Sequence, residues 1–381
     1  MQYPDRSINS NETKLLLDIL NRRAPASADG IDYERFCKLI MSHGLPALVF
    51  CGLRDADSDL RQKIAPSLRP HYLSNIQRNM RLWNEFSTIN KTFTESGVDV
   101  LPLKGMDILA RFYPNFDLRC MCDIDILVKE DQLGAVEMTL VALGYRKNLL
   151  GLKEEYWRKK QCAILFQKDG VALDVHWGLD FKRGRREILT GVWDRARQVE
   201  CGERRIKIFS PEDALFSLAL HLRRFGNILI LKQVLDAARI IAQTKYFDWD
   251  YVLEESCKGR MRATLYFLLT QVALFTDTVV PQGVFERLQL PFLQRWLIRR
   301  FLVKYTFLKG ASLKTNYLKA HLLLYDSVWE ALAYLINIPY EQFCKYYGFR
   351  PYTAGSRTLY HLRVFYMPLR HVLGKPVGAV E

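Results

Sequence analysis

The chain has 381 residues, and its 55 Lys and Arg against 41 Asp and Glu give a formal net charge of +14. Hydrophobic residues make up 49% of the sequence and charged residues 25%, which is ordinary globular composition and argues against long disordered segments. A pI near 9.3 favours an anionic ligand. Nucleotides, nucleic acids, phosphorylated sugars and anionic membranes would all be attracted, so charge alone selects no substrate.

The cysteines and the apolar runs bear on where the protein works. Eight cysteines are scattered without paired CxxC units, so reduced thiols are expected. The first six residues lack the apolar core of a signal peptide, and no run reaches the roughly 18 apolar residues of a membrane span. We expect a cytoplasmic protein with no transmembrane segment.

The first region, residues 1–96, is predicted to be helical. Leu15, Leu16 and Ile19 follow an Asn- and Ser-rich start, and a long amphipathic stretch covers about 71–94. The glycine at position 97 closes this stretch. We therefore place the end of an N-terminal helical region at about residue 96.

The second region, 97–209, is predicted to be an α/β unit. Strand-like runs and helical stretches alternate in it, with strands at 98–103, 122–128, 163–167 and 171–177 and helices at 106–112 and 131–143. The glycine of Lys104-Gly105 permits a tight turn between the first strand and its helix. The Asp169-Gly170 dipeptide lies between two apolar runs and is typical of a hairpin turn.

The third region, 210–381, is predicted to be helical with a basic aromatic tail. Ser210 and Pro211 are typical of an N-cap and a first helical position. Further helices are expected at about 228–243, 260–276 and 313–337. After Tyr340, basic residues alternate with aromatic ones, a pattern that fits stacking on bases, binding to anionic lipid, or the packed end of a helical region. The three regions together predict an α+β fold.

Three aspartates are the candidate metal ligands. Side chains alternate along a strand, so Asp123 and Asp125 share one face while the isoleucines between and after them point into the core. Asp174 and His176 share a face of the later strand by the same rule. Like charges held this close repel, so a cation is expected between them, and carboxylate oxygens suit Mg²⁺ or Mn²⁺.

Several motifs occur in a fixed order over residues 97–243. They are Lys104-Gly105, Tyr113-Pro114, Arg119, Asp123-Ile124-Asp125, Gly144-Tyr145, Leu173-Asp174-Val175-His176-Trp177, Ser210-Pro211-Glu212-Asp213, His221 and Val234-Leu235-Asp236. Their order and rough spacing resemble the uncharacterised bacterial nucleotidyltransferase family of the DNA polymerase β-like superfamily. The chain departs from the superfamily by carrying Lys104-Gly105-Met106 where Gly-Gly or Gly-Ser is usual.

The resemblance implies a polymerase β-like α/β palm and a metal-dependent transfer. Asp123 and Asp125 would bind two metal ions, and Asp174 would bind the catalytic one. A nucleoside monophosphate would move from a nucleoside triphosphate to a hydroxyl of a small molecule, sugar or peptide, with pyrophosphate leaving. By the same resemblance Lys104 and Arg119 would meet the triphosphate, with backbone N–H groups near Gly105 assisting.

Simpler interpretations remain open for each of these side chains. Lys104 is also interpretable as a solvated turn lysine, Arg119 as the ion-pair partner of Asp123, and His176 as a hydrogen-bonded structural histidine. Asp236 would then pair with a helical neighbour such as Arg239. The alternative functions are a non-catalytic nucleotide- or partner-binding protein, and an enzyme that modifies nucleic-acid ends.

Overall fold

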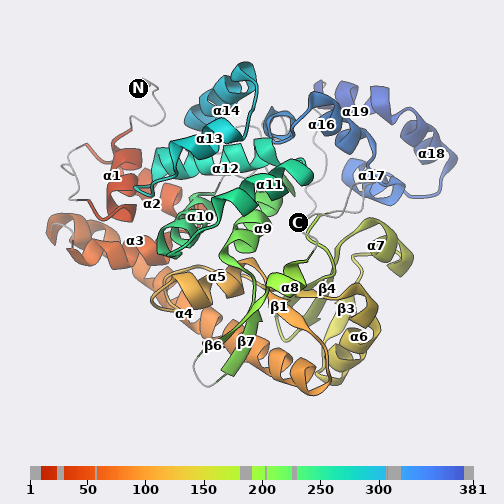
Figure 1. Ribbon diagram of the computed structural model, residues 1–381, viewed down its shortest axis with the longest axis horizontal. Coiled ribbons are helices and arrows are strands. Elements are labelled where there is room, and N and C mark those ends of the chain that lie inside the picture. Colours follow the sequence, from red (N-terminus) through yellow and green to blue (C-terminus); the bar gives the residue numbers. More distant parts are fainter. Residues whose placement is uncertain are drawn as a thin grey trace.

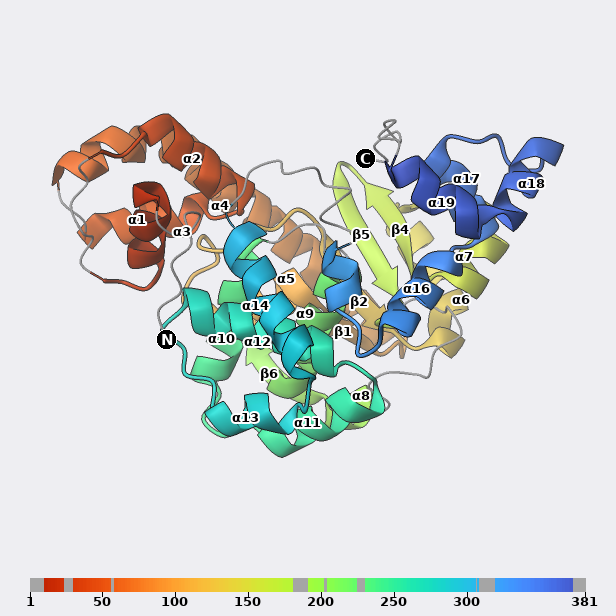
Figure 2. The same ribbon diagram turned by 90° about the horizontal axis from the view of Figure 1, so that it is seen from above.

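The computed structural model describes residues 10–23, 30–55, 58–180, 191–201, 204–224, 230–305, 307 and 319–372. Figure 1 shows a sheet packed among helices, and in Figures 1 and 2 the first three helices and the last three lie at opposite ends of the molecule. Helices and a mixed sheet occur in one chain, which confirms the predicted α+β class.

Among the described residues, four helices precede the sheet: α1 (Asn11–Leu20), α2 (Tyr33–Ser42), α3 (Pro46–Gly52) and α4 (Ser58–Glu95), with a 3₁₀ turn, η1 (Leu53–Asp55), before the last. α4 begins well before the predicted stretch and runs through Pro66 and Pro70. Each proline removes a helical hydrogen bond. The helix continues because Leu60, Ile64 and Leu68 recur every four residues and are fully buried.

In the part of the chain that the structure describes, the main sheet has five strands: β1 (Val100–Pro102), β2 (Ile124–Val128), β3 (Arg146–Asn148), β4 (Ala163–Lys168) and β5 (Val171–His176). Their order across the sheet is β1-β2-β5-β4-β3. β2 and β5 are parallel, while the other neighbours are antiparallel. The parallel pair at the centre places the candidate aspartates side by side.

The hairpin between β4 and β5 turns at the predicted dipeptide. Asp169 and Gly170 have φ values of +48° and +77°, and two positive values are characteristic of a type I′ turn. Three strands were not predicted: β3 and the separate hairpin of β6 (Arg197–Cys201) and β7 (Arg204–Ile208). All three are short or rich in charged residues, so they lack the apolar runs that mark a strand.

The remaining helices link the strands and complete the chain. Those of the α/β part are α5 (Lys104–Phe112), α6 (Leu133–Ala142), α7 (Glu154–Lys160) and α8 (Val192–Arg195), with the 3₁₀ turn η2 (Glu130–Gln132). Those that follow are α9 (Pro211–Arg224), α10 (Leu231–Gln243), α11 (Trp249–Lys258), α12 (Arg262–Phe275), α13 (Gln282–Arg287), α14 (Phe292–Tyr305), α16 (Val328–Ile336), α17 (Tyr340–Tyr347), α18 (Ala354–His361) and α19 (Arg363–Val372). α5 packs against β2, α9 and α10, so the first strand-helix turn lies next to the later helices.

One apolar core runs from α1 to α16 and joins the sheet to the helices on both sides of it. A second, smaller core forms from residues that follow α16, including Phe343, Tyr347, Tyr360 and Tyr366. The aromatic residues of the basic tail therefore pack largely on one another. The predicted helix at 313–337 lies partly outside the described residues. Within the described residues, no helix is both long and apolar enough to cross a membrane.

A histidine joins the N-terminal helices to α10. The Nδ1 of His43 accepts a hydrogen bond from the backbone N–H of Leu231 at 3.2 Å, and the ring is 4% exposed. Burial lowers the pKa of His43 to about 4 from an ordinary 6.5. The neutral ring is thus favoured in the folded chain, so its contribution to stability is full above pH 6.5 and is lost as the pH falls toward 4.

We therefore expect acid to destabilise the parent chain more than a His43→Asn variant, whose amide oxygen can accept the same hydrogen bond. Between pH 7 and pH 4 the free energy of unfolding of the parent should fall by about 3 kcal/mol more than that of the variant, which is the free energy that corresponds to the shift in the pKa of His43. Urea unfolding of both proteins at several pH values measures it, and carboxylates titrate equally in the two chains. Parallel pH profiles would contradict the prediction.

Candidate active site

The register of β2 and β5 brings two of the candidate carboxylates together. Asp125 is the direct partner of Asp174 across the parallel pair, and Asp123 lies immediately before β2. Ile124 and Ile126 are fully buried on the opposite face, as the alternation predicts. Asp125 is 6% exposed, so its charge requires a partner.

Asp125, Asp174 and His176 form a group that could hold a metal ion. One ligand atom from each lies within 4.8 Å of the others. The Nε2 of His176 also lies 3.0 Å from Oδ1 of Asp125, and the ring is 3% exposed. His176 therefore lies beside Asp125 and belongs to the group that could hold a metal ion.

Lys104 supplies the cation that the carboxylates require. Its Nζ lies 2.6 Å from Oδ1 of Asp125, and its side chain is 17% exposed, so it is not a solvated turn lysine. The backbone of Lys104 has a φ of +47°, a left-handed conformation that favours glycine. A lysine held there at a conformational cost is typical of a functional site.

The two carboxylates of the β2 motif have opposite pKa shifts. Burial would raise the pKa of Asp125, but the Lys104 ammonium and the hydrogen bond with His176 outweigh burial and hold that pKa below its usual range. Burial and repulsion from Asp125 raise the pKa of Asp123, although nearby cations oppose this rise. Asp125 is therefore firmly ionised, and a second cation would relieve the repulsion on Asp123.

Arg119 forms its ion pair with Asp236 of α10, not with Asp123. Its Nε lies 3.0 and 3.1 Å from the two oxygens of Asp236, and its Nη2 lies 2.8 Å from Oδ2. The Tyr113 hydroxyl donates to the same carboxylate at 2.9 Å. The expected pairing of Asp236 with Arg239 is wrong, because Arg239 lies over the ring of Tyr113 instead.

Gly105 makes room for this buried arginine. A Cβ atom at position 105 would lie 2.8 Å from Nη1 of Arg119 and 3.3 Å from Sδ of Met121. Since the guanidinium is fixed by Asp236, it cannot move away freely. The glycine is thus required for close packing of the helix start on the loop that carries Arg119.

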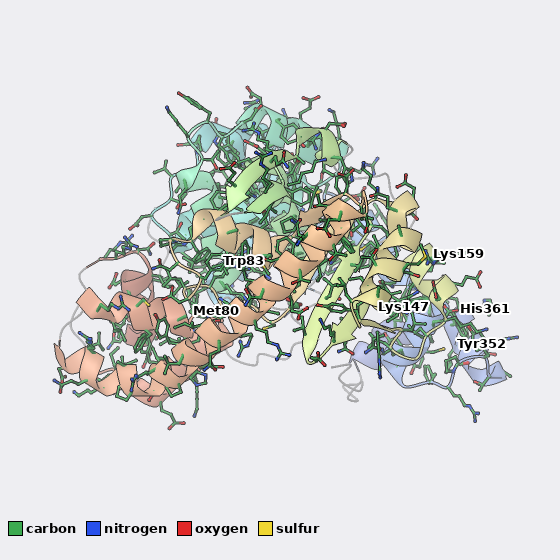
Figure 3. The ribbon with its side chains drawn as sticks, turned by 90° about the horizontal axis from the view of Figure 1, so that it is seen from below. Met80, Trp83, Lys147, Lys159, Tyr352 and His361 are labelled. Carbon is green, nitrogen blue, oxygen red and sulfur yellow. The ribbon has the colours of Figure 1, made fainter. Side chains whose placement is uncertain are left out.

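Residues that were not predicted hold that loop, 113–123, in place. The Nδ2 of Asn79 donates to the carbonyl oxygens of Phe116 and Arg119, at 2.6 and 2.7 Å, and Asn75 donates to Asp117. Trp83, labelled on α4 in Figure 3, packs against Phe116, with the two ring centroids 4.7 Å apart. The sequence feature that could have indicated this role is the spacing of Asn75 and Asn79, two asparagines four residues apart on one helix face, which is buried in the structure.

Lys232 of α10 approaches the same loop from the other side. Its Nζ donates to the carbonyl of Cys120 at 3.0 Å. Burial and repulsion from Arg119 lower the pKa of Lys232, and its charge in turn acts on Asp123. α4 and α10 therefore both position the chain that leads into the Asp123-Ile124-Asp125 motif.

Carboxylates clustered beside a lysine are typical of proteins that bind metal ions together with nucleotide phosphates. The model of an uncharacterised nucleotidyltransferase family matches residues 29–277. The chain belongs to this family, which confirms the resemblance found in its motifs.

No curated protein matches the chain. Among solved structures, that of the antibiotic-resistance factor ANT(2'')-Ia is similar, with 14% sequence identity and a TM-score of 0.36. The similarity covers 49% of this chain and 94% of that one. At this TM-score it supports neither a substrate nor a mechanism for the chain.

Proposed function

We propose that the protein transfers a nucleoside monophosphate from a nucleoside triphosphate to a hydroxyl of a small molecule, sugar or peptide. The observation that carries the proposal is the register of β2 and β5, which sets Asp125 against Asp174 with Asp123 two residues away. Membership of a nucleotidyltransferase family supports the reaction class.

The side chains at this site fit a divalent cation. Carboxylate oxygens are the ligands that Mg²⁺ and Mn²⁺ prefer, and the imidazole of His176 suits Mn²⁺ better than Mg²⁺. We propose Asp125 and Asp174 as ligands from the group that they form with His176, and Asp123, which lies outside that group and immediately before β2, as the third. A bound Mg²⁺ or Mn²⁺ would neutralise charge on the phosphates and polarise the attacked group.

The other site residues would act on the nucleotide and the acceptor. Lys104 pairs with Asp125, and we propose that it exchanges this ion pair for one with the triphosphate. Arg119 faces Asp236, so we propose that it contributes positive potential near Asp123 and positions its loop. Asp174 would accept a hydrogen bond from the acceptor hydroxyl and hold it for attack on the α-phosphate.

The direct test of this function follows the α-phosphate. The chain is incubated with each of the four α-³²P-labelled nucleoside triphosphates, Mg²⁺ and a small-molecule extract as the source of acceptors. We expect label to enter a new product from at least one nucleotide, and EDTA or Asp125→Asn to prevent it. Label transfer that persists in the variant would contradict the assignment.

A Lys104→Gly variant separates a phosphate-binding lysine from a structural one. Glycine adopts the observed φ without strain, so the backbone is kept. Because the ammonium no longer competes for Asp125, Mn²⁺ affinity without nucleotide should rise about tenfold, whereas triphosphate affinity should fall at least tenfold.

Calorimetry of the same variant with each ligand provides the measurement. Arg22→Gly is the matched control, because Arg22 is an exposed cation with a φ of +55°. If both affinities fell together, Lys104 would be a structural part of the site and not a competitor of the metal ion.

A non-catalytic nucleotide-binding protein is the second candidate. The contacts of Asp125 favour this candidate, because its Oδ1 already contacts Lys104 and His176 and its charge is thus balanced without a metal ion. Such a protein would bind nucleotide equally well with Mg²⁺ and with EDTA, whereas the proposed enzyme should bind it at least tenfold more tightly with Mg²⁺.

A further inference from the structure

A pocket lies between α3, η1 and the first half of α4, and none of the candidate active-site residues lines it. Its volume is about 970 Å³, which is the size of a small-molecule site. The residues that line it include Phe50, Arg54, Arg61, Gln62, Pro66 and Arg69.

The polar wall of this pocket is basic. Arg54, Arg61 and Arg69 are exposed, and the charge of Arg54 acts on the neighbouring thiol of Cys51. No described acidic residue lines the pocket. Arg61 and Arg69 are two turns apart on one face of α4, roughly 12 Å along its axis. Positive charge spread over this distance fits an anion that is larger than a free phosphate.

Two prolines add hydrogen-bond acceptors to the basic wall. Proline has no N–H, so Pro66 leaves the carbonyl of Gln62 without its helical partner, and Pro70 does the same to the carbonyl of Pro66. Both carbonyls belong to residues that line the pocket. A ligand that also donates hydrogen bonds, such as one bearing hydroxyl groups, would satisfy them.

The rest of the wall is apolar. Phe50, Ala65 and the proline rings provide flat apolar surfaces, against which the C–H face of a sugar ring can pack. Phe50 also stacks on Tyr72, with ring centroids 4.7 Å apart, and the Tyr72 hydroxyl donates to Asp117. Asp117 belongs to the loop 113–123, so an occupant of the pocket would lie two side chains from the loop that carries Arg119.

We propose that this pocket binds an acidic or phosphorylated sugar. The guanidiniums meet the anionic group, the freed carbonyls accept from the hydroxyls, and the apolar wall covers the ring. Binding at this site requires neither nucleotide nor metal ion, so the proposal is independent of the proposed transfer reaction.

The test is calorimetry of the full chain with glucose 6-phosphate, glucuronate, neutral glucose and inorganic phosphate. At least one acidic sugar should bind at least tenfold more tightly than glucose and than phosphate. An Arg61→Gln/Arg69→Gln variant should weaken that binding at least tenfold, whereas Arg35→Gln, an exposed arginine on α2, should leave it unchanged.

A Pro66→Ala variant tests the freed carbonyl separately. Alanine restores the helical hydrogen bond to Gln62, so thermal stability should be kept or raised while affinity for the acidic sugar falls several-fold. Absence of binding by both acidic sugars, equal binding of inorganic phosphate, or sugar binding unaffected by the double arginine variant would each overturn the proposal. All of these measurements are made without nucleotide, so their failure would not contradict the proposed transfer reaction, which has a separate test.

Discussion

Replacing Asp174 by asparagine is expected to reduce nucleotidyl transfer by on the order of a thousandfold, while Mg-nucleotide affinity stays within about tenfold of the parent. Asp174 is partly exposed and pairs in register with the buried Asp125. We assign it to the catalytic metal ion and the acceptor hydroxyl, groups that matter more in the transition state than in nucleotide binding. The measurement is α-³²P transfer together with calorimetry on the same protein.

The matched control is Asp169→Asn, the same substitution at the exposed turn of the hairpin that carries Asp174. It should change neither transfer nor affinity. If Asp174→Asn transferred label as fast as the parent, Asp174 would be a strand residue without a catalytic role, and a mechanism with three carboxylates would be wrong.

Replacing Asp236 by alanine is expected to destabilise the fold by about 3 to 5 kcal/mol, the usual cost of leaving a buried charge without its partner. Asp236 is fully buried and meets both Nε and Nη2 of Arg119, which is 5% exposed. The substitution would also release the Tyr113 hydroxyl. Urea unfolding measures the loss.

Two further variants show whether the unpaired charge of Arg119 causes the loss of stability in Asp236→Ala. An Arg119→Met/Asp236→Leu double variant should recover most of the stability, because it removes both charges. Asp250→Ala breaks an exposed ion pair with Arg287 in the same helical region and should cost less than about 1 kcal/mol. If the double variant were as unstable as Asp236→Ala, lost packing and not the unpaired charge would account for most of the destabilisation.

The local sequence pattern was sufficient to predict the central strands and the hairpin between β4 and β5. Alternation placed Asp123 and Asp125 on one face, and the Asp169-Gly170 turn set β4 beside β5. These features are encoded within a few residues, so the sequence alone predicts them.

Long-range partners could not be predicted in this way. Arg119 and Asp236 are 117 residues apart, and their ion pair depends on how α10 packs beside the loop. The continuation of α4 through Pro66 is likewise decided by tertiary packing, since buried leucine and isoleucine contacts outweigh the lost hydrogen bond. Lys104 was predicted to contact the triphosphate, whereas its ion pair with Asp125 and its left-handed backbone are not indicated by any local pattern.

We propose that Asp123, Asp125 of β2 and Asp174 of β5 bind a divalent metal ion together with a nucleotide, and a measurement of metal binding tests this most directly. Mg²⁺ or Mn²⁺ is titrated calorimetrically into the chain in the presence of a nonhydrolysable nucleoside triphosphate. We predict that the parent binds the metal ion, and that Asp123→Asn and Asp125→Asn each weaken binding at least tenfold while the fold is kept. Metal affinity unchanged in both variants would contradict the assignment of these residues as ligands.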